Sequence, residues 1–234
     1  MQFENELAIG TLLKRYKRFL ADVMLKDGKL VTAHVPNTGS MKSTNEPGSD
    51  VALSYHPDPK RKLKWTLELV RAEGGAWVGV NTMKPNGIVE EAILSKEIPG
   101  LKRFINLRRE VPYGKNSRVD LLLEGGKRNT YIEVKNVTYK LGDKALFPDA
   151  VTARGTKHLL ELANVVTTGH RGVIFFLVNR GDCLSMSPAW EIDPTYSRTL
   201  HEVSKRGVRV MAYQSVIDTK GIRLGEKIRV VLEQ

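Results

Sequence analysis

Three charged side chains interrupt two otherwise apolar segments of the chain, residues 117–124 and 130–137. Asp120 lies in the first segment, and Glu133 and Lys135 lie in the second. The surrounding leucine, isoleucine and valine residues predict two strands that are covered on both faces. Because a charge inside such a strand is costly unless it is paired or bound to a ligand, these three residues are the first candidates for chemistry.

A hairpin between the two segments would bring the carboxylates together. Residues 125–128 would form its four-residue loop, pairing Glu124 with Asn129, and counting back from this pair places Asp120 directly opposite Glu133. Side chains paired in this way have Cβ atoms about 4.5 to 5.5 Å apart, where two like charges destabilise a sheet. The pair therefore needs a compensating partner.

A divalent cation, Mg²⁺ or Mn²⁺, would supply that compensation. Magnesium prefers one or two carboxylates and keeps several waters, which leaves room for phosphate oxygens. Lys135 shares a face with Glu133 and would position the attacking water or stabilise negative charge on the phosphoryl group. Asp120, Glu133 and Lys135 are thus predicted catalytic residues of a metal-dependent phosphodiesterase; the alternative is a surface ladder of ion pairs without chemistry.

The chain is strongly basic. Its 234 residues include 37 Lys and Arg against 26 Asp and Glu, a formal net charge of +11. Such an excess favours a polyanionic partner, and the clustering of the charge favours DNA, with RNA an open alternative, over a mere effect on solubility. The candidate nucleic-acid-binding residues are Lys14, Arg15, Lys17, Arg18, Lys60, Arg61, Lys62, Arg154 and Lys157.

Several classes of protein are disfavoured. The longest apolar run, residues 172–178, is too short for a membrane span, and the N-terminus lacks the features of a secretory signal. A single cysteine, Cys183, and histidines without zinc spacing argue against disulfides and a zinc site, and glycine motifs for nucleotide cofactors are missing. We expect a cytoplasmic protein without a membrane partner; the sequence leaves the oligomeric state open.

The first part of the chain, residues 1–83, reads as a small all-β domain. Five alternating segments predict strands over 14–25, 29–35, 50–56, 63–72 and 76–82. Five short strands suit an OB-like barrel, a common nucleic-acid platform, although the connection 56–62 is too short for the helix usual in that fold. The segment 36–42, PNTGSMK, carries small polar donors that suit phosphate contacts and equally suit an ordinary turn.

The second part, residues 84–234, reads as an α/β domain. Its pattern predicts a helix over 88–98 with Asn86 available as its cap, three strands, a helix over about 149–168 opened by Asp149, a buried strand, a helix over 193–206 and a further strand. The tail adds a possible edge strand. The core order αβββαβ implies a mixed sheet with helices packed on it.

The order of these elements, with Asp on the second strand and Glu-x-Lys on the third, resembles the PD-(D/E)XK nuclease superfamily. More closely, the segments KRYKRFLADV, PNTGSMK, SRVDLLL, YIEVKNVT and FPDAVTARGTKHL resemble the sugar fermentation stimulation protein A family across nearly the whole chain. The resemblance implies an OB-like N-terminal domain, a nuclease-like C-terminal domain, DNA binding and a link to maltose utilisation. The proline that precedes the aspartate in the superfamily motif is replaced here by Val119.

By this resemblance, Asp120, Glu133 and Lys135 fall on the core triad, and a further metal ligand on the first helix falls on Glu90 or Glu91, of which we take Glu91. Two functions follow. The first is a largely sequence-independent DNA-binding protein with a magnesium-dependent nuclease site. The alternative is a non-catalytic DNA-binding regulator of sugar-utilisation genes that uses the nuclease fold as a scaffold. A small-molecule or protein-interaction module is the third possibility.

Overall fold

The computed structural model describes residues 1–114 and 117–233, and its N-terminal part is built from short strands. These strands are β1 (Ala8–Tyr16), β2 (Leu20–Leu25), β3 (Leu30–His34), β4 (Asp50–Tyr55), β5 (Trp65–Arg71) and β6 (Trp77–Gly79). They follow the order β3-β2-β1-β4-β5-β6, and a parallel pairing between β3 and β5 closes the first five into a ring. The expected OB-like barrel is confirmed.

Two of the barrel strands differ from the sequence prediction. The segment 14–25 is not one strand, because the chain turns between β1 and β2 at Lys17 and Arg18, whose φ angles are 48° and 64°. Glycine or asparagine normally marks such left-handed positions, so the turn carries no sequence signal. The last predicted strand shrinks to β6, which continues the sheet past the closed ring, and described residues 35–49 connect β3 to β4 as a loop.

The C-terminal part is an α/β domain. Its elements are α1 (Pro85–Leu94), β7 (Asn106–Tyr113), β8 (Ser117–Glu124), β9 (Thr130–Val137), β10 (Tyr139–Leu141), β11 (Lys144–Phe147), α2 (Ala153–Thr167), β12 (Arg171–Val178), β13 (Ser185–Pro188), α3 (Pro194–Lys205), β14 (Arg209–Ile217), β15 (Ile222–Lys227) and β16 (Arg229–Val230). The main sheet has the order β15-β14-β12-β9-β8-β7. It is mixed, because β12 pairs in parallel with both β9 and β14 while the outer pairs are antiparallel.

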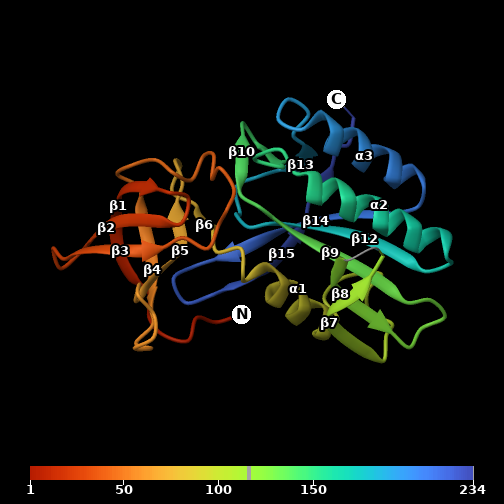
Figure 1. The fold of residues 1–234 in the computed structure, drawn as a ribbon, viewed down its shortest axis with the longest axis horizontal. Helices are drawn as coiled ribbons and strands as arrows, with labels where there is room; N and C mark the ends of the chain where they lie inside the picture. Colours follow the sequence, from red (N-terminus) through yellow and green to blue (C-terminus); the bar gives the residue numbers. More distant parts are fainter. Residues whose placement is uncertain (115–116, 234) are drawn as a thin grey trace.

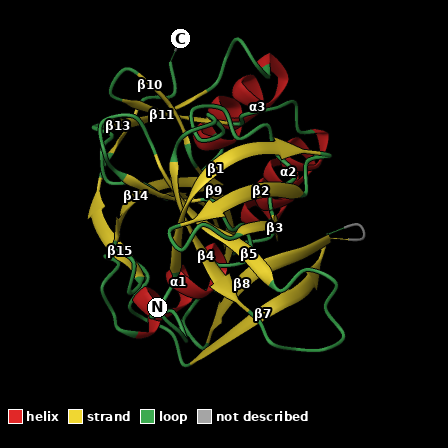
Figure 2. Cartoon of the chain, turned by 90° about the vertical axis from the view of Figure 1, so that its left-hand side faces the viewer, coloured by secondary structure: helices red, strands yellow, loops and turns green. Residues whose placement is uncertain are grey.

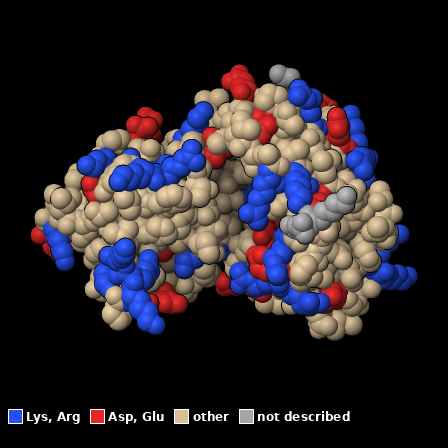
Figure 3. Space-filling model, in the orientation of Figure 1, with Lys and Arg blue, Asp and Glu red and all other residues tan. Residues whose placement is uncertain are grey.

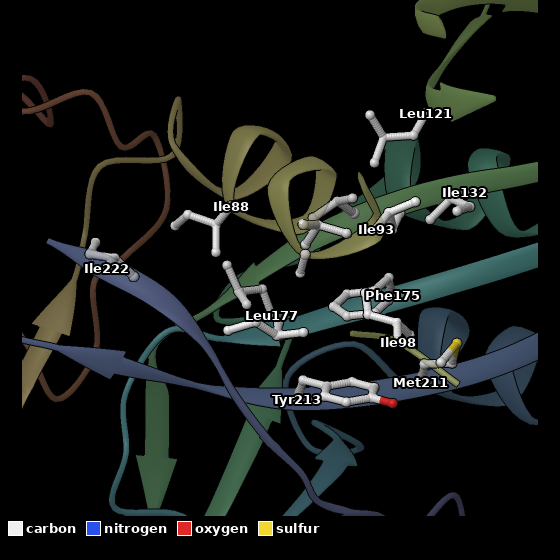
Figure 4. Packing of buried hydrophobic residues seen from close by; sticks show 14 of the residues in the cluster. Ile88, Ile93, Ile98, Leu121, Ile132, Phe175, Leu177, Met211, Tyr213 and Ile222 are labelled. Carbon is white, nitrogen blue, oxygen red and sulfur yellow. The ribbon is translucent and has the colours of Figure 1, made fainter. Parts of the chain in front are cut away.

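Helices cover both faces of the main sheet (Figure 1). Alternation along β12 sends Phe175 into the core beneath α1 and Phe176 into the core beneath α2 and α3. Figure 4 shows the first of these cores, in which Ile88 and Ile93 of α1 face the sheet residue Phe175. The strands are therefore buried on both sides, as their continuous apolar runs predicted.

The predicted helix starts need correction. Asn86 does not cap α1, which begins at Pro85 after Lys84 without a side-chain cap. Asp149 does not open α2, since the cap is Thr152, whose hydroxyl accepts a 3.1 Å hydrogen bond from Gly155 N–H. The short strands β10, β11, β13 and β16, which form a separate sheet, were not predicted. The possible edge strand in the tail is confirmed as β15.

The barrel packs directly against the α/β domain. Figure 2, viewed from the barrel side, shows β1, β2 and β3 in front of the second domain. Ala52 and Leu69 of the barrel are buried in the core beneath α1, and Gly79 N–H donates a 2.9 Å hydrogen bond to the Asn179 carbonyl. The N-terminus also reaches this domain, because Gln2 forms a β-bridge with Gly221. Within the described chain, the helices are all too short or too polar to span a membrane.

Candidate active site between the two domains

The predicted hairpin register is correct, and it ends at the candidate carboxylates. The β8–β9 ladder pairs Leu123 with Thr130 and Leu121 with Ile132, so the next pair in the same count is Asp120 with Glu133. Regular pairing stops there. The Asp120 Oδ2 atom instead accepts a 2.7 Å hydrogen bond from the backbone N–H of Val134. The strands thus separate where the acidic groups lie, which leaves space beside them.

Asp120 sits in a site that disfavours its charge. Its Oδ1 atom accepts a 2.9 Å hydrogen bond from the Asn86 side chain, which projects from the first turn of α1. Burial and then the neighbouring charge of Glu133 raise the pKa of Asp120 to about 6. The hydrogen bonds from Val134 and Asn86 and the charge of Lys135 oppose this rise without cancelling it.

Glu133 is almost completely buried, at 2% exposure. Its Oε1 atom accepts a 2.7 Å hydrogen bond from Lys135 Nζ and another from His158 Nδ1. Burial raises the pKa of Glu133, but the bonds from His158 and Lys135 outweigh burial, so the pKa lies below its usual value. The Oε2 atom is buried and has no hydrogen-bond partner among the described residues.

His158 connects Glu133 to a candidate nucleic-acid residue. It lies on α2 at 5% exposure, and its Nε2 atom accepts a 3.4 Å hydrogen bond from Arg154 Nε. Donation from Nδ1 and acceptance at Nε2 fix one neutral tautomer of the ring. α2 therefore helps to fix the orientation of the Glu133 carboxylate.

These groups lie in a cavity of about 680 Å³ between the two domains, called here the carboxylate cavity. Figure 3 shows a hollow between two lobes, with Lys and Arg side chains on both of them. The polar part of the lining includes Asn86, Asp120, Glu133, Lys135, Arg154 and His158 from the α/β domain, and Arg18, Asn37, Thr38 and Gly39 from the barrel. The candidate site is therefore shared by both domains.

The barrel contributes one wall of this cavity through the segment 36–42. The guanidinium of Arg15 donates hydrogen bonds of 2.9, 3.0 and 3.2 Å to three carbonyls of the segment. Asp149, which precedes α2, accepts hydrogen bonds of 3.1 Å from the Ser40 hydroxyl and 2.9 Å from Met41 N–H. Residues 36–42, called here the wall, are thus held by hydrogen bonds from both domains, with Asp149 connecting them to the α/β domain.

The close contact between the wall and the Asp149 carboxylate favours glycine at position 39. A side chain added at Gly39 would place its Cβ atom 2.7 and 2.8 Å from the two carboxylate oxygens of Asp149. Real Cβ atoms do not approach other atoms so closely, so the barrel segment and Asp149 fit without spare room. The PNTGSMK segment is therefore a structural wall as well as a possible contact surface.

The predicted basic residues fall into two groups. Arg15 is occupied by the wall, whereas Lys17 and Arg18 are exposed at the β1–β2 turn, where Arg18 lines the cavity. The exposed Lys60 and Lys62 and the half-buried Arg61 lie in the loop between β4 and β5. Lys14 pairs with Asp22 at 3.4 Å, and Lys157 pairs with Glu161 at 3.7 Å.

Backbone pairing brings the two basic loops of the barrel to one end of it. Val35 N–H, just after β3, donates a 2.7 Å hydrogen bond to the Phe19 carbonyl of the β1–β2 turn. On its other side β3 pairs with the start of β5, where His34 meets Thr66. The Arg61 guanidinium donates a 2.8 Å hydrogen bond to the hydroxyl of Thr66. Both loops therefore flank the strand that leads into the wall of the cavity.

The predicted helix carboxylate is not brought to the site. Glu91 is 58% exposed, and its carboxylate pairs with the Met1 amine at 2.6 Å. Glu90 pairs with Arg109 at 3.5 Å. Among residues 1–114 and 117–233, groups of three Asp, Glu, His or Cys side chains arranged for a metal ion do not occur. The candidate cation ligands that the structure brings together are Asp120 and Glu133.

Three site residues were not identified from the sequence in these roles. Asn86 was taken as a helix cap and Asp149 as a helix start, and His158 was considered among the histidines without zinc spacing. Each contacts a residue at least 25 positions away, so periodicity along the chain could not pair them. The segment FPDAVTARGTKHL, which carries Asp149 and His158, did mark this region by resemblance.

Comparison with known proteins agrees with the two-domain fold. Residues 13–80 match the model of the SfsA N-terminal OB domain, and residues 83–221 match that of the sugar fermentation stimulation protein RE domain. Sugar fermentation stimulation protein homologs from Pelobacter propionicus and Geobacter sulfurreducens are each 53% identical, covering 97% and 99% of this chain and 98% and 99% of theirs.

A solved structure shares the fold over nearly its full length. The structure of Pyrococcus furiosus SfsA in complex with Ca²⁺ superimposes with a TM-score of 0.87 at 26% identity, covering 99% of this chain and 98% of that one. The two domain matches, the similarity of the homologs over their whole length and this structural agreement lead to one conclusion. The chain belongs to the sugar fermentation stimulation protein (SfsA) family.

Proposed function

We propose that the protein binds DNA largely without regard to sequence and hydrolyses phosphodiester bonds at the carboxylate cavity with Mg²⁺ or Mn²⁺. The single observation that carries the proposal is the buried Glu133 Oε2 atom, which has no hydrogen-bond partner in the described part of the chain and lies beside the half-buried carboxylate of Asp120. A buried, unpartnered carboxylate oxygen is costly in a structural site and useful in a binding site.

The donor set fits a hard divalent cation. Asp120 and Glu133 offer carboxylate oxygens, which magnesium and calcium prefer, and two carboxylates suffice for magnesium when waters complete the shell. The related Pyrococcus furiosus protein was solved in complex with Ca²⁺. When bound, a divalent cation would supply Lewis acidity toward a phosphoryl oxygen.

The side chains around the pair have separable tasks in this proposal. Lys135 Nζ, held 2.7 Å from Glu133 Oε1, would donate to a phosphoryl oxygen or to the attacking water and stabilise negative charge in the transition state. His158 and Asn86 would orient the two carboxylates. Arg154 lines the cavity and would contact a neighbouring phosphate.

The basic barrel end supports binding that does not depend on sequence. Arg18, which lines the cavity, and the Lys60–Lys62 loop at the same end of the barrel present positive charge. Contacts of this kind with phosphates carry no sequence information, and they weaken steeply as salt displaces them. Affinity should therefore fall with salt to a similar degree for unrelated DNA sequences.

Two measurements test the proposal. The first is fluorescence anisotropy with unrelated oligonucleotides over a salt series, where strong and salt-insensitive preference for one sequence would contradict it. The second is incubation of single-stranded, linear and circular DNA with Mg²⁺ or Mn²⁺. Cleavage should be lost in Glu133→Gln and retained in Glu124→Gln. Glu124 is a suitable control because it lies on the neighbouring strand β8, outside the cavity, where its carboxylate pairs with Arg108 at 3.5 Å.

The second candidate is a regulator of sugar-utilisation genes that binds DNA without cutting it. It is favoured by one observation: Lys135 and His158 already donate hydrogen bonds to one oxygen of Glu133, as in a closed structural network. Under this alternative the wild-type protein leaves every DNA form intact with either metal, while Glu133→Gln binds DNA as well as the wild type does.

A further inference from the structure

The carboxylate cavity has an apolar end that phosphate chemistry does not use. Beside the acidic pair, its lining includes Tyr139, Leu146, Phe147, Pro148 and Val151. All of these come from β10, from β11 and from the short connection that runs from β11 to α2. A sugar–phosphate backbone and a cation both prefer polar surroundings, so this surface needs a different occupant.

The apolar end is held in place by packing against the core. The Phe147 ring packs against Phe176 and Tyr196, with ring centroids 5.6 and 5.3 Å apart. The adjoining Asp149 accepts hydrogen bonds from Ser40 and Met41 of the barrel wall. Val151 nevertheless stays 76% exposed, although it is a large apolar residue beside a buried network. The surface is thus preformed, and part of it is open to a ligand.

We propose that this end is a nucleobase subsite, so that the substrate of the cavity is a single strand of DNA rather than an intact duplex. The inference rests on the proposed function and names its substrate class. A base offers the flat apolar face that such a surface fits, while the phosphate joined to it would reach Lys135 and the acidic pair. Stacking on apolar and aromatic side chains is tolerant of sequence, which agrees with binding that reads no sequence.

The geometry of the cavity argues against a duplex in the same place. An intact duplex presents base edges in its grooves and keeps base faces stacked, so it has no face to offer. The cavity volume of about 680 Å³ lies in the range that holds small-molecule ligands. Its barrel wall cannot swing aside freely, because Arg15 and Asp149 hold it from both domains. A single or unpaired strand meets these limits.

The test compares three ligands with the wild-type protein in EDTA, so that binding is measured without cleavage. They are a fluorescent single strand, its blunt duplex, and the same strand with a central run of abasic sites. The expected result is weaker binding of the abasic strand by at least roughly fivefold, because each stacked base is worth that much or more. Equal affinity for the intact and abasic strands overturns the inference.

A pair of variants ties the effect to the cavity. Val151→Ser removes apolar surface at an exposed position, and Leu184→Ser does the same at a site 73% exposed and outside the lining. Val151→Ser should weaken binding of the intact strand by about threefold and leave binding of the abasic strand unchanged, while Leu184→Ser changes neither.

The outcomes separate the two proposals. If all three ligands bind with equal affinity, after allowance for their different numbers of phosphates, the proposed function stands and the base subsite is rejected. Failure to bind any of the three rejects the proposed function itself. A duplex bound more tightly than the single strand, with Val151→Ser affecting both equally, also overturns the subsite.

Discussion

Two of the cavities formed by the described residues lie between the barrel and the α/β domain, and the half-buried aspartates beside them differ in how far their charge is compensated. The larger one, about 1020 Å³, is lined by Ser43, Arg71, Lys140 and Arg180 among others and is called here the Arg180 cavity. Beside it Asp182 accepts hydrogen bonds of 2.6 and 2.8 Å from the Arg180 guanidinium and one of 2.8 Å from Lys140 Nζ. The smaller is the carboxylate cavity.

The difference appears in the pKa values of the two aspartates. Burial tends to raise the pKa of Asp182, but the hydrogen bonds from Arg180 and Lys140 outweigh it and hold the pKa at about 2. Burial and the charge of Glu133 raise the pKa of Asp120 to about 6. Beside the Arg180 cavity, cations fully compensate the charge of Asp182. In the carboxylate cavity, Lys135 and His158 stabilise the ionised form of Glu133, whereas the charge of Asp120 is not compensated. The balance of charge, rather than cavity volume, therefore separates a structural network from a candidate active site.

The largest expected effect comes from Asp120→Asn. The variant removes one carboxylate of the pair but keeps an oxygen that can accept the Val134 N–H, and the Asn86 amide can rotate to accept from the new NH2 group, so the fold should be preserved. Cleavage should fall by roughly a thousandfold, because the interactions of a metal site with the transition state are worth several kcal/mol. Folding stability in urea should stay constant or rise by about 1 kcal/mol, since a buried repulsion is lost.

Loss of activity together with a clear loss of stability would contradict this view of Asp120. In that case the residue would belong to a structural network of the Asp182 kind. The comparison is therefore made in the same urea titration, with the free energy of unfolding taken from midpoint and slope together.

The next largest effect is expected from Asp182→Ala. Arg180 is 2% exposed, so its guanidinium would remain as a buried charge, with hydrogen bonds to Thr138 and Ser43 but without a carboxylate. Breaking such a pair by removing one partner should lower the free energy of unfolding by about 3 kcal/mol. DNA cleavage at a temperature where the variant is folded should equal that of the wild type. Unchanged stability would show that the network of Arg180, Asp182 and Lys140 does not contribute to holding the two domains together.

The pH dependence of stability sharpens the same contrast with a smaller effect. The pKa of Asp182 is about 2 in the folded protein and near its ordinary value of 3.8 when unfolded, so the unfolded state binds its proton more readily. The stabilisation is thus present above about pH 4 and is lost as the pH falls toward 2. It amounts to about 1 to 2 kcal/mol, because solvent partly screens a carboxylate that is 24% exposed.

Measuring the difference in unfolding free energy between wild type and Asp182→Ala at several pH values checks this expectation. The difference should be constant from pH 7 to about pH 5 and should shrink at lower pH, by the amount that this carboxylate contributes. A difference that stays the same down to pH 2 would mean that the ionised form of Asp182 is not what stabilises the fold.

The sequence predicted the elements that local patterns encode and missed those that distant contacts define. The carboxylate register followed from counting, because a hairpin with a short loop fixes its own pairing. The start of α2 was placed too early, because Asp149 is a good cap by type but is held by the barrel segment instead. The burial of Arg180 gave no signal in the sequence, because the Thr138 carbonyl that accepts its hydrogen bond lies 42 residues away and an exposed arginine looks the same in a sequence.

The same reasoning corrects how the basic residues were grouped. Arg15 and Arg18 are three positions apart and looked equivalent, yet one guanidinium binds backbone carbonyls and the other lies exposed at the cavity. The difference arises because the turn at Lys17 and Arg18 reverses the chain between them. Arg15 already donates its hydrogen bonds to carbonyls of the protein and is therefore a poor phosphate ligand. In the same way, the Asp182 carboxylate is already bound by Arg180 and Lys140 and is a poor ligand for a metal ion.

The smallest predicted effect tests this extension of the comparison. Arg18→Ala should reduce the slope of log affinity for DNA against log salt by about 0.7 to 0.9, the value of one neutralised phosphate. Arg15→Ala should leave the slope unchanged, even though it lowers folding stability by loosening the wall segment. Lys26→Ala, at the opposite end of β2, serves as the exposed control and should change neither quantity. If Arg15→Ala flattens the salt dependence as much as Arg18→Ala does, its guanidinium contacts phosphate in the complex, and the wall must open when DNA binds.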